Sequence, residues 1–237
     1  MNSNKVGVFV MKNRRYRLHF QLLLLLVTLA ACDPHVSPAD SIAVAPYYQN
    51  QSLIEHAWQL PVARTYRNRF EYQINRLFCG PATVVNVFYS LNIERFTQNT
   101  VFDRTKISYW KARFLGLNLD ELATLIRDNA PLEVEIMRDL SLESFREAMR
   151  HANDPGFRYL INFNRQPLFG VRVGHHSPIG GYLQEWDLVF VLDVLDDYRP
   201  FLVPVARLFE AMDTIDSETG RKRGLLRINA AAESPTS

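Results

Sequence analysis

The chain has 237 residues, 47% of them hydrophobic, which is enough for one substantial core and too few for an easy division into two domains. Its formal charge of +2 comes from residues 1–32, which hold five Lys and Arg side chains and no acidic one. The remainder carries 22 basic and 25 acidic side chains, a net charge of −3. Because this remainder is mildly acidic and has no long basic stripe, its charge gives no reason to expect nucleic-acid binding.

The N-terminus has the pattern of a bacterial export signal. A basic stretch at 12–17 precedes an apolar run at 22–29, which is too short to span a bilayer comfortably. The run ends in Leu-Ala-Ala-Cys, which resembles the lipobox, where cleavage precedes a cysteine that becomes lipid-modified. We therefore expect a signal peptide over residues 1–32 and lipidation at Cys32. An ordinary secretory signal with an incidental cysteine is the alternative.

Two further features of this region bear on location. Asp33, directly after the cysteine, resembles the inner-membrane retention signal of some Gram-negative bacteria. Met11 is an alternative start, because a complete signal follows it. We expect a protein anchored by lipid to the periplasmic face of a bacterial membrane, with the inner membrane favoured.

The next segments set the limits of the folded body. Residues 33–51 are rich in Pro, Ser and Ala without apolar periodicity, which predicts a flexible tether. Residues 230–237 have the composition of a disordered tail. A single folded domain is therefore expected over 52–229.

The first half of this domain has helical patterns. Apolar residues recur at helical spacing after Pro81, which suits a first helical turn, so the preceding Cys79 is expected at a helix N-terminus. A second helix is predicted at 117–129, and a third at 141–151 with Ser141 as its N-cap.

The second half has β character. Apolar runs typical of strands lie at 157–163, 177–183, 188–194 and 223–228, and a helix is expected at 205–212. The second and third runs are separated by a turn at 184–187. Helices first and antiparallel strands later predict an α+β domain, a division also found in papain-like enzymes.

Cys79 is the candidate nucleophile. If Cys32 carries lipid, Cys79 is the one remaining thiol, and a lone cysteine is either a buried apolar filler or a reactive group. A helix N-terminus stabilises negative charge and therefore the thiolate, which is the nucleophilic form.

The predicted hairpin supplies partners for this thiol. A loop of three or five residues centred on Gln184 pairs His175 with Asp193, with Cβ atoms about 4.5–5.5 Å apart. An Asp that orients an imidazole, and an imidazole that exchanges a proton with the thiol, form a catalytic triad. A two-residue loop pairs His176 with Asp193 instead, so the hairpin pattern leaves both histidines open.

Three segments resemble the phytochelatin synthase family. QINRLFCG at 73–80 resembles the active-site segment, in which a glutamine stands six residues before the nucleophilic cysteine. GHHSPIGGYLQEWDLVFVLDV at 174–194 resembles the GHxSPIGGY motif and the LDV strand that follows it. LFEAMDTIDSETGRKRG at 208–224 resembles the closing segment. The three motifs occur in the family's order within about residues 64–228, which makes the signal specific.

The resemblance implies a role for each matched residue. Cys79 is the nucleophile, His175 the general base and acid, and Asp193 the orienting carboxylate. His176 is then an ordinary side chain on the opposite face of the sheet. Gln73 donates to the oxyanion of the tetrahedral intermediate, together with the backbone N–H of the nucleophile.

The resemblance also implies a fold and a reaction. The expected fold is papain-like α+β: a helical first half with the nucleophile at a helix N-terminus, packed on an antiparallel sheet, so that 52–229 forms the catalytic domain. Family members attack the Cys–Gly bond of glutathione, release glycine and pass γ-glutamylcysteine to a second glutathione or to water. The chain resembles the short bacterial members, in which hydrolysis is prominent. Glutathione or related γ-glutamyl thiol peptides are the expected partners, and a homodimer is left open.

No tightly bound cofactor and no metal site in the protein are predicted. Cd, Zn or Cu would enter as thiolate complexes of the substrate.

The segment after Asp193 departs from the family, which usually continues with an Arg and a Lys-Tyr-Pro-Pro run. Here Leu-Asp-Asp-Tyr-Arg-Pro follows at 195–200. Tyr198 and Arg199 are retained as candidate substrate-binding residues, since an Arg can clamp a carboxylate. The two aspartates would repel an anionic peptide, which puts the substrate preference in doubt.

Two alternatives remain. A papain-like periplasmic peptidase would use the same triad on other peptides. A non-enzymatic lipoprotein would bind thiol peptides or metal through Cys79, His175 and His176. Adjacent strand residues point to opposite faces, so the two histidines suit a tetrahedral metal site poorly.

Overall fold

The computed structural model describes residues 41–230. The predicted signal peptide, the lipidation of Cys32, the first part of the tether and most of the predicted tail lie outside these residues. Within the described part, no helix combines the length and the apolar character needed to cross a membrane.

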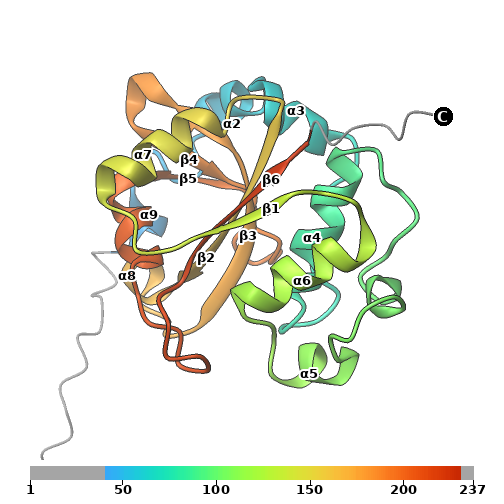
Figure 1. Cartoon of the computed structure of the whole chain (residues 1–237). Coiled ribbons are helices and arrows are strands. Elements are labelled where there is room, and N and C mark those ends of the chain that lie inside the picture. The colour runs from blue at the N-terminus through green and yellow to red at the C-terminus, as the bar shows by residue number, and fades with distance from the viewer. Residues whose placement is uncertain (1–40, 231–237) are drawn as a thin grey trace, which may run out of the picture. The chain divides into compact units, whose positions relative to one another are not determined.

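The domain is built on one sheet of six strands, all paired antiparallel, in the order β1-β6-β2-β3-β4-β5 (Figure 1). The strands are β1 (Val134–Met137), β2 (Phe157–Asn164), β3 (Gly174–Leu183), β4 (Leu188–Val191), β5 (Phe201–Pro204) and β6 (Gly224–Asn229). The long strands β2 and β3 lie at the centre of the sheet, where each is paired on both sides.

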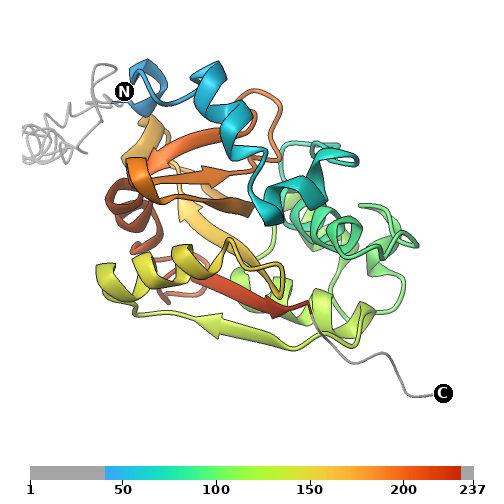
Figure 2. The same cartoon turned by 90° about the horizontal axis from the view of Figure 1, so that it is seen from above.

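Helices cover both faces of this sheet (Figures 1 and 2). One face is covered by α2 (Gln51–Ala57), α3 (Pro61–Arg67), α4 (Cys79–Ser90), α5 (Tyr109–Phe114) and α6 (Leu119–Asn129). The other is covered by α7 (Leu142–His151), α8 (Gln166–Phe169) and α9 (Val205–Met212). Short 3₁₀ helices lie at Ile42–Val44, Thr100–Phe102 and Gln184–Trp186.

Two hydrophobic cores result, one on each face of the sheet. Alternate residues of β2 and β4 serve different cores: Leu160 and Phe190 pack against the α4 side, whereas Ile161 and Val189 pack against the α7 and α9 side. Because both faces are covered, these strands are apolar at nearly every position instead of alternating. This explains why the sequence shows them as continuous apolar runs.

The expected α+β class is confirmed, with helices in the first half and the antiparallel sheet mainly in the second. The helix expected around Pro81 begins at Cys79, and the helix expected at 141–151 has Ser141 as its N-cap. The helix expected at 117–129 begins at Leu119 behind a capping box of Asn118 and Glu121. The edge strands β1 and β5 were not expected; each is four residues long, and neither lies in a long apolar run like the one that contains β4.

The predicted tether is shorter than expected. Residues 33–51 were assigned to it, but Ile42 and Tyr48 are buried in the core beside α8, and α2 begins at Gln51. The Tyr48 carbonyl accepts a hydrogen bond of 2.9 Å from the N–H of Leu202. The aromatic side chains of this segment therefore outweigh its Pro- and Ser-rich composition. At the other end, Ala230 donates its N–H to Gly156 over 2.8 Å, so the first residue of the predicted tail still belongs to the fold.

The hairpin between β3 and β4 differs from the predicted register. Leu183 pairs with Leu188 across a four-residue connection, and a bulge between Ile179 and Gly181 shifts the pairing again. The strand β4 ends at Val191, so the predicted pairing of His175 with Asp193 across the hairpin is wrong.

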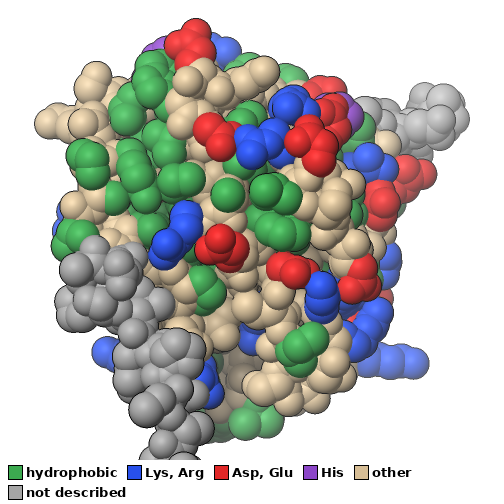
Figure 3. Space-filling model, turned by 90° about the vertical axis from the view of Figure 1, so that its left-hand side faces the viewer, with side chains coloured by type: hydrophobic (Ala, Val, Ile, Leu, Met, Phe, Trp, Pro, Cys, Tyr) green, Lys and Arg blue, Asp and Glu red, His purple; other side chains and the backbone are tan. Residues whose placement is uncertain are grey.

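The surface carries charges of both signs. On the face shown in Figure 3, acidic and basic side chains lie beside one another, with hydrophobic side chains between them. On α7, Arg150 pairs in this way with Glu143 and Glu147.

Candidate active site

Cys79 is the first residue of α4 and is 7% exposed. The N-cap residue, Phe78, makes no side-chain cap to the first turn. Every residue of α4 is buried, which fixes the position of its N-terminus against the sheet. The first-turn N–H groups and the helix dipole favour a negative charge on the cysteine, as the sequence predicts.

His175 and Asp193 lie together beside this thiol. The Nε2 atom of His175 is 3.0 Å from Oδ1 of Asp193, and both side chains are buried. The N–H of Leu195 donates to the same oxygen over 2.8 Å. A hydrogen bond also joins His175 to Cys79. Because Nε2 faces the carboxylate, Nδ1 is the imidazole atom left for the sulfur.

Each member of this set has a shifted pKa. Burial would raise the pKa of the Cys79 thiol, but the hydrogen bond to His175 and the charge of the imidazolium together hold it below its ordinary value. Burial would lower the pKa of His175, whereas the Asp193 carboxylate raises it, and the net direction is upward. Burial would raise the pKa of Asp193, but His175 and Arg165 hold it below its usual range. All three directions favour a thiolate beside an imidazolium.

Arg165 also contacts Asp193, and the sequence did not single it out. Its Nη2 atom lies 2.9 Å from Oδ1 and 2.7 Å from Oδ2, and its side chain is 1% exposed. The residue directly follows β2. A charged residue at the end of an apolar run was the available signal, but a strand end is usually exposed, so the signal is weak.

His176 points to the other side of the sheet from His175. In the ladder between β2 and β3, His175 pairs with Phe163 and His176 with Asn162. The Nε2 atom of His176 is 2.8 Å from the carbonyl oxygen of Leu117. Burial lowers the pKa of His176 to about 3, so the imidazole stays neutral. It is a buried, hydrogen-bonded side chain, and Asp193 is not its partner.

Gln73 lies next to the segment that follows Asp193. Its backbone N–H donates to the Val194 carbonyl over 2.8 Å, and its side-chain Nε2 donates to the Asn75 carbonyl over 2.8 Å. Its amide keeps a second N–H for another acceptor. The residue is not part of the cavity lining described next, so its oxyanion role stays a prediction.

Cys79, His175 and Arg165 line one cavity of about 470 Å³. Its wall carries charges of both signs. The basic members are Arg76, Arg165 and Arg223, and the acidic members are Asp197, Asp216 and Glu218.

The two candidate substrate-binding residues, Tyr198 and Arg199, line different depressions of the surface. Tyr198 lines this cavity, with its ring centroid 3.8 Å from the guanidinium carbon of Arg165. Arg199 is absent from the lining and instead lines a second depression, which includes Trp58 and Tyr72. The structure therefore does not bring Arg199 to Cys79.

A polar cluster also lines the cavity. Arg223 Nη1 lies 2.6 Å from Oδ2 of Asp216 and 3.0 Å from Oδ1 of Asn162. The Nδ2 atom of Asn162 in turn lies within hydrogen-bond distance of the His176 ring. His176 therefore supports Arg223 through Asn162.

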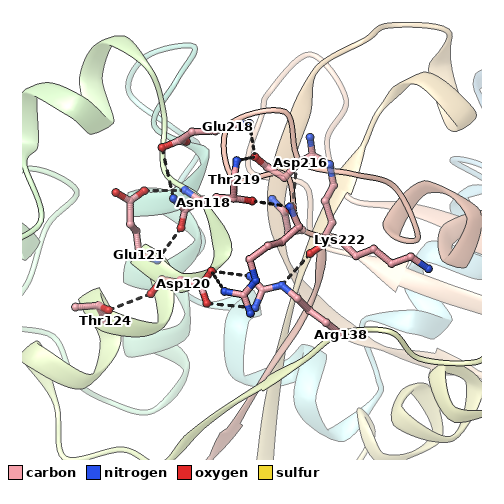
Figure 4. Close-up of polar contacts among 12 residues, drawn as sticks. Asn118, Asp120, Glu121, Thr124, Arg138, Asp216, Glu218, Thr219 and Lys222 are labelled. Atoms are coloured by element: carbon pink, nitrogen blue, oxygen red, sulfur yellow. Dashed lines mark hydrogen bonds and ion pairs between the residues drawn. The ribbon is translucent and has the colours of Figure 1, made fainter.

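The loop that carries Asp216 is tied to α6 by a charged network (Figure 4). Asp120 accepts from Arg138 over 2.9 Å and from Arg221 over 3.0 Å. Lys111 pairs with both Glu121 and Glu218. The network holds the loop from which residues 216–218 and Arg223 line the cavity. Among residues 41–230, no group of three or more His, Cys, Asp and Glu side chains could hold a metal ion.

A buried cysteine at a helix N-terminus, joined through a histidine to a carboxylate, defines an enzyme of the cysteine-nucleophile class. Residues 40–225 match the sequence profile described as phytochelatin synthase. The chain belongs to the phytochelatin synthase family.

Several relatives carry the name glutathione γ-glutamylcysteinyltransferase. Enzyme 3 of Lotus japonicus is 31% identical over 179 residues, covering 70% of this chain and 37% of that protein. Enzyme 2 of Arabidopsis thaliana is 29% identical over 70% of this chain and 39% of its own length. The Schizosaccharomyces pombe enzyme is 25% identical over 62% and 38%. The chain thus spans well under half the length of these relatives.

Solved structures are also similar to the chain. The peptidase domain of Streptococcus ComA, a bi-functional ABC transporter, matches with a TM-score of 0.46 and 12% identity, over 67% of this chain and 96% of that domain.

Proposed function

We propose that the protein cleaves the Cys–Gly bond of glutathione through a γ-glutamylcysteinyl thioester on Cys79. The observation that carries the proposal is the placement of Cys79 and His175 at one mixed-charge cavity, with the buried Asp193 bonded to His175, in a chain of this family. Glycine is the first product, and the thioester is then resolved by water or by a second thiol peptide.

The first step uses the charge distribution of the site. The Cys79 thiolate attacks the carbonyl carbon, and the developing oxyanion is stabilised by the N-terminal N–H groups of α4, with the Gln73 amide as the proposed second donor. The imidazolium of His175 gives its proton to the leaving nitrogen as the C–N bond breaks. Glycine departs with a neutral amine, and the acyl group stays on sulfur.

The second step reverses the roles. His175, now neutral, takes a proton from the incoming water or amine while that nucleophile attacks the thioester. The C–S bond breaks and the thiolate is restored beside the imidazolium. Asp193 keeps the imidazole in one orientation throughout, because Nε2 remains bonded to its carboxylate.

The charges that line the cavity suit the γ-glutamyl group of one glutathione better than they suit two glutathione molecules bound together. The α-amino and α-carboxylate groups of a γ-linked glutamate remain free, so a carboxylate and a guanidinium side by side, as in Asp216 and Arg223, match them in charge. Asp197 and Glu218 add negative charge to the lining and would repel a second anionic peptide. These features support hydrolysis as the dominant outcome and transfer to a second glutathione as the minor one.

Metal and membrane enter the proposal only indirectly. Cd, Zn or Cu would act as thiolate complexes of the substrate. Lipid attachment at Cys32 and a periplasmic location rest on the sequence of residues 1–33, outside the described part of the chain. Loss of fatty-acid labelling in Cys32→Ala would support the anchor, and unchanged labelling would exclude it. A homodimer stays a prediction.

The deciding experiment is mass spectrometry of the full chain incubated with glutathione, with and without Cd or Zn. We expect free glycine together with a γ-glutamylcysteinyl mass on the Cys79 peptide, and neither in Cys79→Ser. Glycine without γ-glutamylcysteine polymers would assign hydrolysis. No glycine and no adduct under any metal condition would refute the proposal.

The departure at 195–200 favours a second candidate, a peptidase for other peptides. Arg199 lies outside the cavity lining, so it does not replace the family's arginine there. Comparing glutathione with an ordinary Glu-Cys-Gly peptide separates the two functions. Equal rates would favour the general peptidase, whereas a strong preference for the γ-linkage favours glutathione.

A further inference from the structure

Arg165 is a charged side chain enclosed in an aromatic pocket. Its guanidinium carbon lies 3.8 Å from the Tyr198 ring centroid and 5.6 Å from the ring centroids of Phe163 and Phe169. Its backbone N–H donates to the Val173 carbonyl over 2.9 Å, which fixes the turn after β2. A guanidinium withdrawn from water is costly unless an anion compensates it.

Asp193 is that anion. Within residues 41–230, the Oδ2 atom of Asp193 accepts a hydrogen bond from Arg165 alone. The Oδ1 atom accepts from His175, Leu195 and Arg165. The carboxylate is 0% exposed, so water does not replace a missing partner. Removing Arg165 would leave Oδ2 unpaired and the Asp193 carboxylate free to rotate away from Nε2 of His175.

The other groups around Asp193 do not supply a permanent positive charge. His175 faces it from β3 and is charged only when protonated. Tyr48, Tyr72 and Tyr198 lie near enough to interact with the carboxylate or with Arg165, and burial raises the pKa of Tyr48 and of Tyr72, so both stay neutral. Cys79 faces the carboxylate only through the imidazole.

We propose that Arg165 is a positioning residue of the active site, which holds the Asp193 carboxylate against His175 and thereby keeps the His175–Cys79 pair in its charged form. Arg165 is hydrogen-bonded to Asp193 and makes no hydrogen bond to Cys79, although its charge also lowers the pKa of that thiol. The inference deepens the proposed function and rests on it for the role of Cys79. It concerns the reactivity of the thiol, so it can be tested without glutathione.

The test measures iodoacetamide alkylation of Cys79 in the full chain as a function of pH. The Cys79 and Cys32 peptides are separated by mass spectrometry, so only the first is followed. In Arg165→Met, we expect the acid limb of the alkylation profile to move up by about one pH unit, which is about tenfold less thiolate below the midpoint. Arg165→Lys restores the charge without the planar fork and should give a smaller shift.

A matched control separates this role from a merely structural one. Arg158 is also buried, but it lies at the other end of β2 and bonds to Ser90. Arg158→Met should lower thermal stability and leave the alkylation profile unchanged. An equal shift in Arg158→Met, or a wild-type profile in folded Arg165→Met, would overturn the proposal.

A second comparison remains decisive if Arg165→Met does not fold. The double variant Arg165→Met with Asp193→Asn contains no uncompensated buried charge. Because the hydrogen bonds of Arg165 go to Asp193, the shift in the double variant should be smaller than the sum of the shifts in the two single variants. Fully additive shifts would contradict the mechanism. A shifted profile in Arg165→Met with no glutathione turnover in wild type would preserve this inference and reject the proposed function.

Discussion

The Nε2 atom of His175 lies 3.0 Å from Oδ1 of Asp193, although the two residues are not paired in the sheet. His175 pairs with Phe163 of β2, and Asp193 lies two residues beyond the end of β4. The carboxylate is brought back by local bonds: the N–H of Leu192 donates to the Pro178 carbonyl, and the N–H of Leu195 donates to Oδ1 of Asp193. The geometry of the triad therefore depends on this short non-strand segment.

The first prediction concerns the pH dependence of Cys79. The pKa of the thiol is held below its ordinary value by His175, and the pKa of His175 is raised by Asp193. The ion pair should therefore exist between the lowered pKa of the Cys79 thiol and the raised pKa of the His175 imidazole, a window that begins below the ordinary cysteine pKa. We expect alkylation of Cys79 by iodoacetamide to persist in that range in wild type. In His175→Ala, the acid limb should move to higher pH, because both the hydrogen bond and the charge are lost.

A control for this prediction is His151→Ala. His151 lies on α7 beside Glu147 and is more than half exposed. Its removal should leave the profile of Cys79 unchanged. Identical profiles for wild type and His175→Ala would show that the imidazole does not activate the thiol.

The sequence was sufficient for some parts of the site and insufficient for others. The helix N-terminus at Cys79 follows from local rules, since Pro81 and the apolar spacing fix it. The register of the hairpin does not, because the bulge between Ile179 and Gly181 depends on packing between strands. The family resemblance predicts His175 and Asp193 as partners, and their side chains lie within hydrogen-bond distance, but the geometric reason for pairing them across the hairpin was wrong.

Arg165 and the N-terminal segment were missed for a related reason. The burial of a charged side chain depends on a partner far away in the sequence, here Asp193 at a separation of 28 residues. Likewise, residues 41–51 have the composition of a tether, and only the hydrophobic surface that they cover makes them part of the fold. Composition describes a segment alone, whereas burial describes its fit to the rest of the chain.

The second prediction concerns His176. His176→Phe keeps a planar aromatic ring, slightly larger than the imidazole, but loses the bond to the Leu117 carbonyl and the contact with Asn162. Unsatisfied buried groups should reduce the free energy of unfolding by about 1–3 kcal/mol, measured by urea denaturation. Since Asn162 supports Arg223, we also expect a higher KM for glutathione with a smaller change in kcat. The alkylation profile of Cys79 should not move, and a shift comparable to that of His175→Ala would contradict this separation of roles.

The third prediction concerns the charged network of Figure 4. Asp120→Asn weakens the ties to Arg138 and Arg221, and both ion pairs are partly exposed, so the unfolding free energy should fall by less than about 1 kcal/mol. The loop that carries Asp216 should nevertheless lose order, which raises KM for glutathione. Glu143→Gln on α7 removes comparable surface ion pairs away from the cavity and should leave KM unchanged. If both variants alter KM equally, the change in KM arises from the altered net charge of the protein and not from loss of order in the loop.

The fourth prediction concerns residues 41–50, which connect the N-terminal side of the chain to the active site. The Gln49 side chain donates to the Tyr198 carbonyl over 2.6 Å, and the Tyr48 hydroxyl donates to the same oxygen over 3.3 Å. The Tyr48 ring also packs edge-on against Phe169 and in a tilted arrangement against Phe201, with centroid distances of 5.8 Å and 5.3 Å. Tyr198 in turn covers Arg165.

Tyr48→Ala should therefore affect both stability and chemistry. Loss of a buried aromatic ring should reduce the free energy of unfolding by about 3–5 kcal/mol, measured by urea denaturation. Val44→Ala, in the same segment but 68% exposed, should change it by less than about 0.5 kcal/mol. At temperatures where Tyr48→Ala is still folded, freer movement of Tyr198 should loosen Arg165 and move the acid limb of Cys79 alkylation upward. Equal stability of the two variants would mean that residues 41–50 contribute nothing to the free energy of unfolding. The segment would then be part of the tether, as the sequence predicted for residues 33–51.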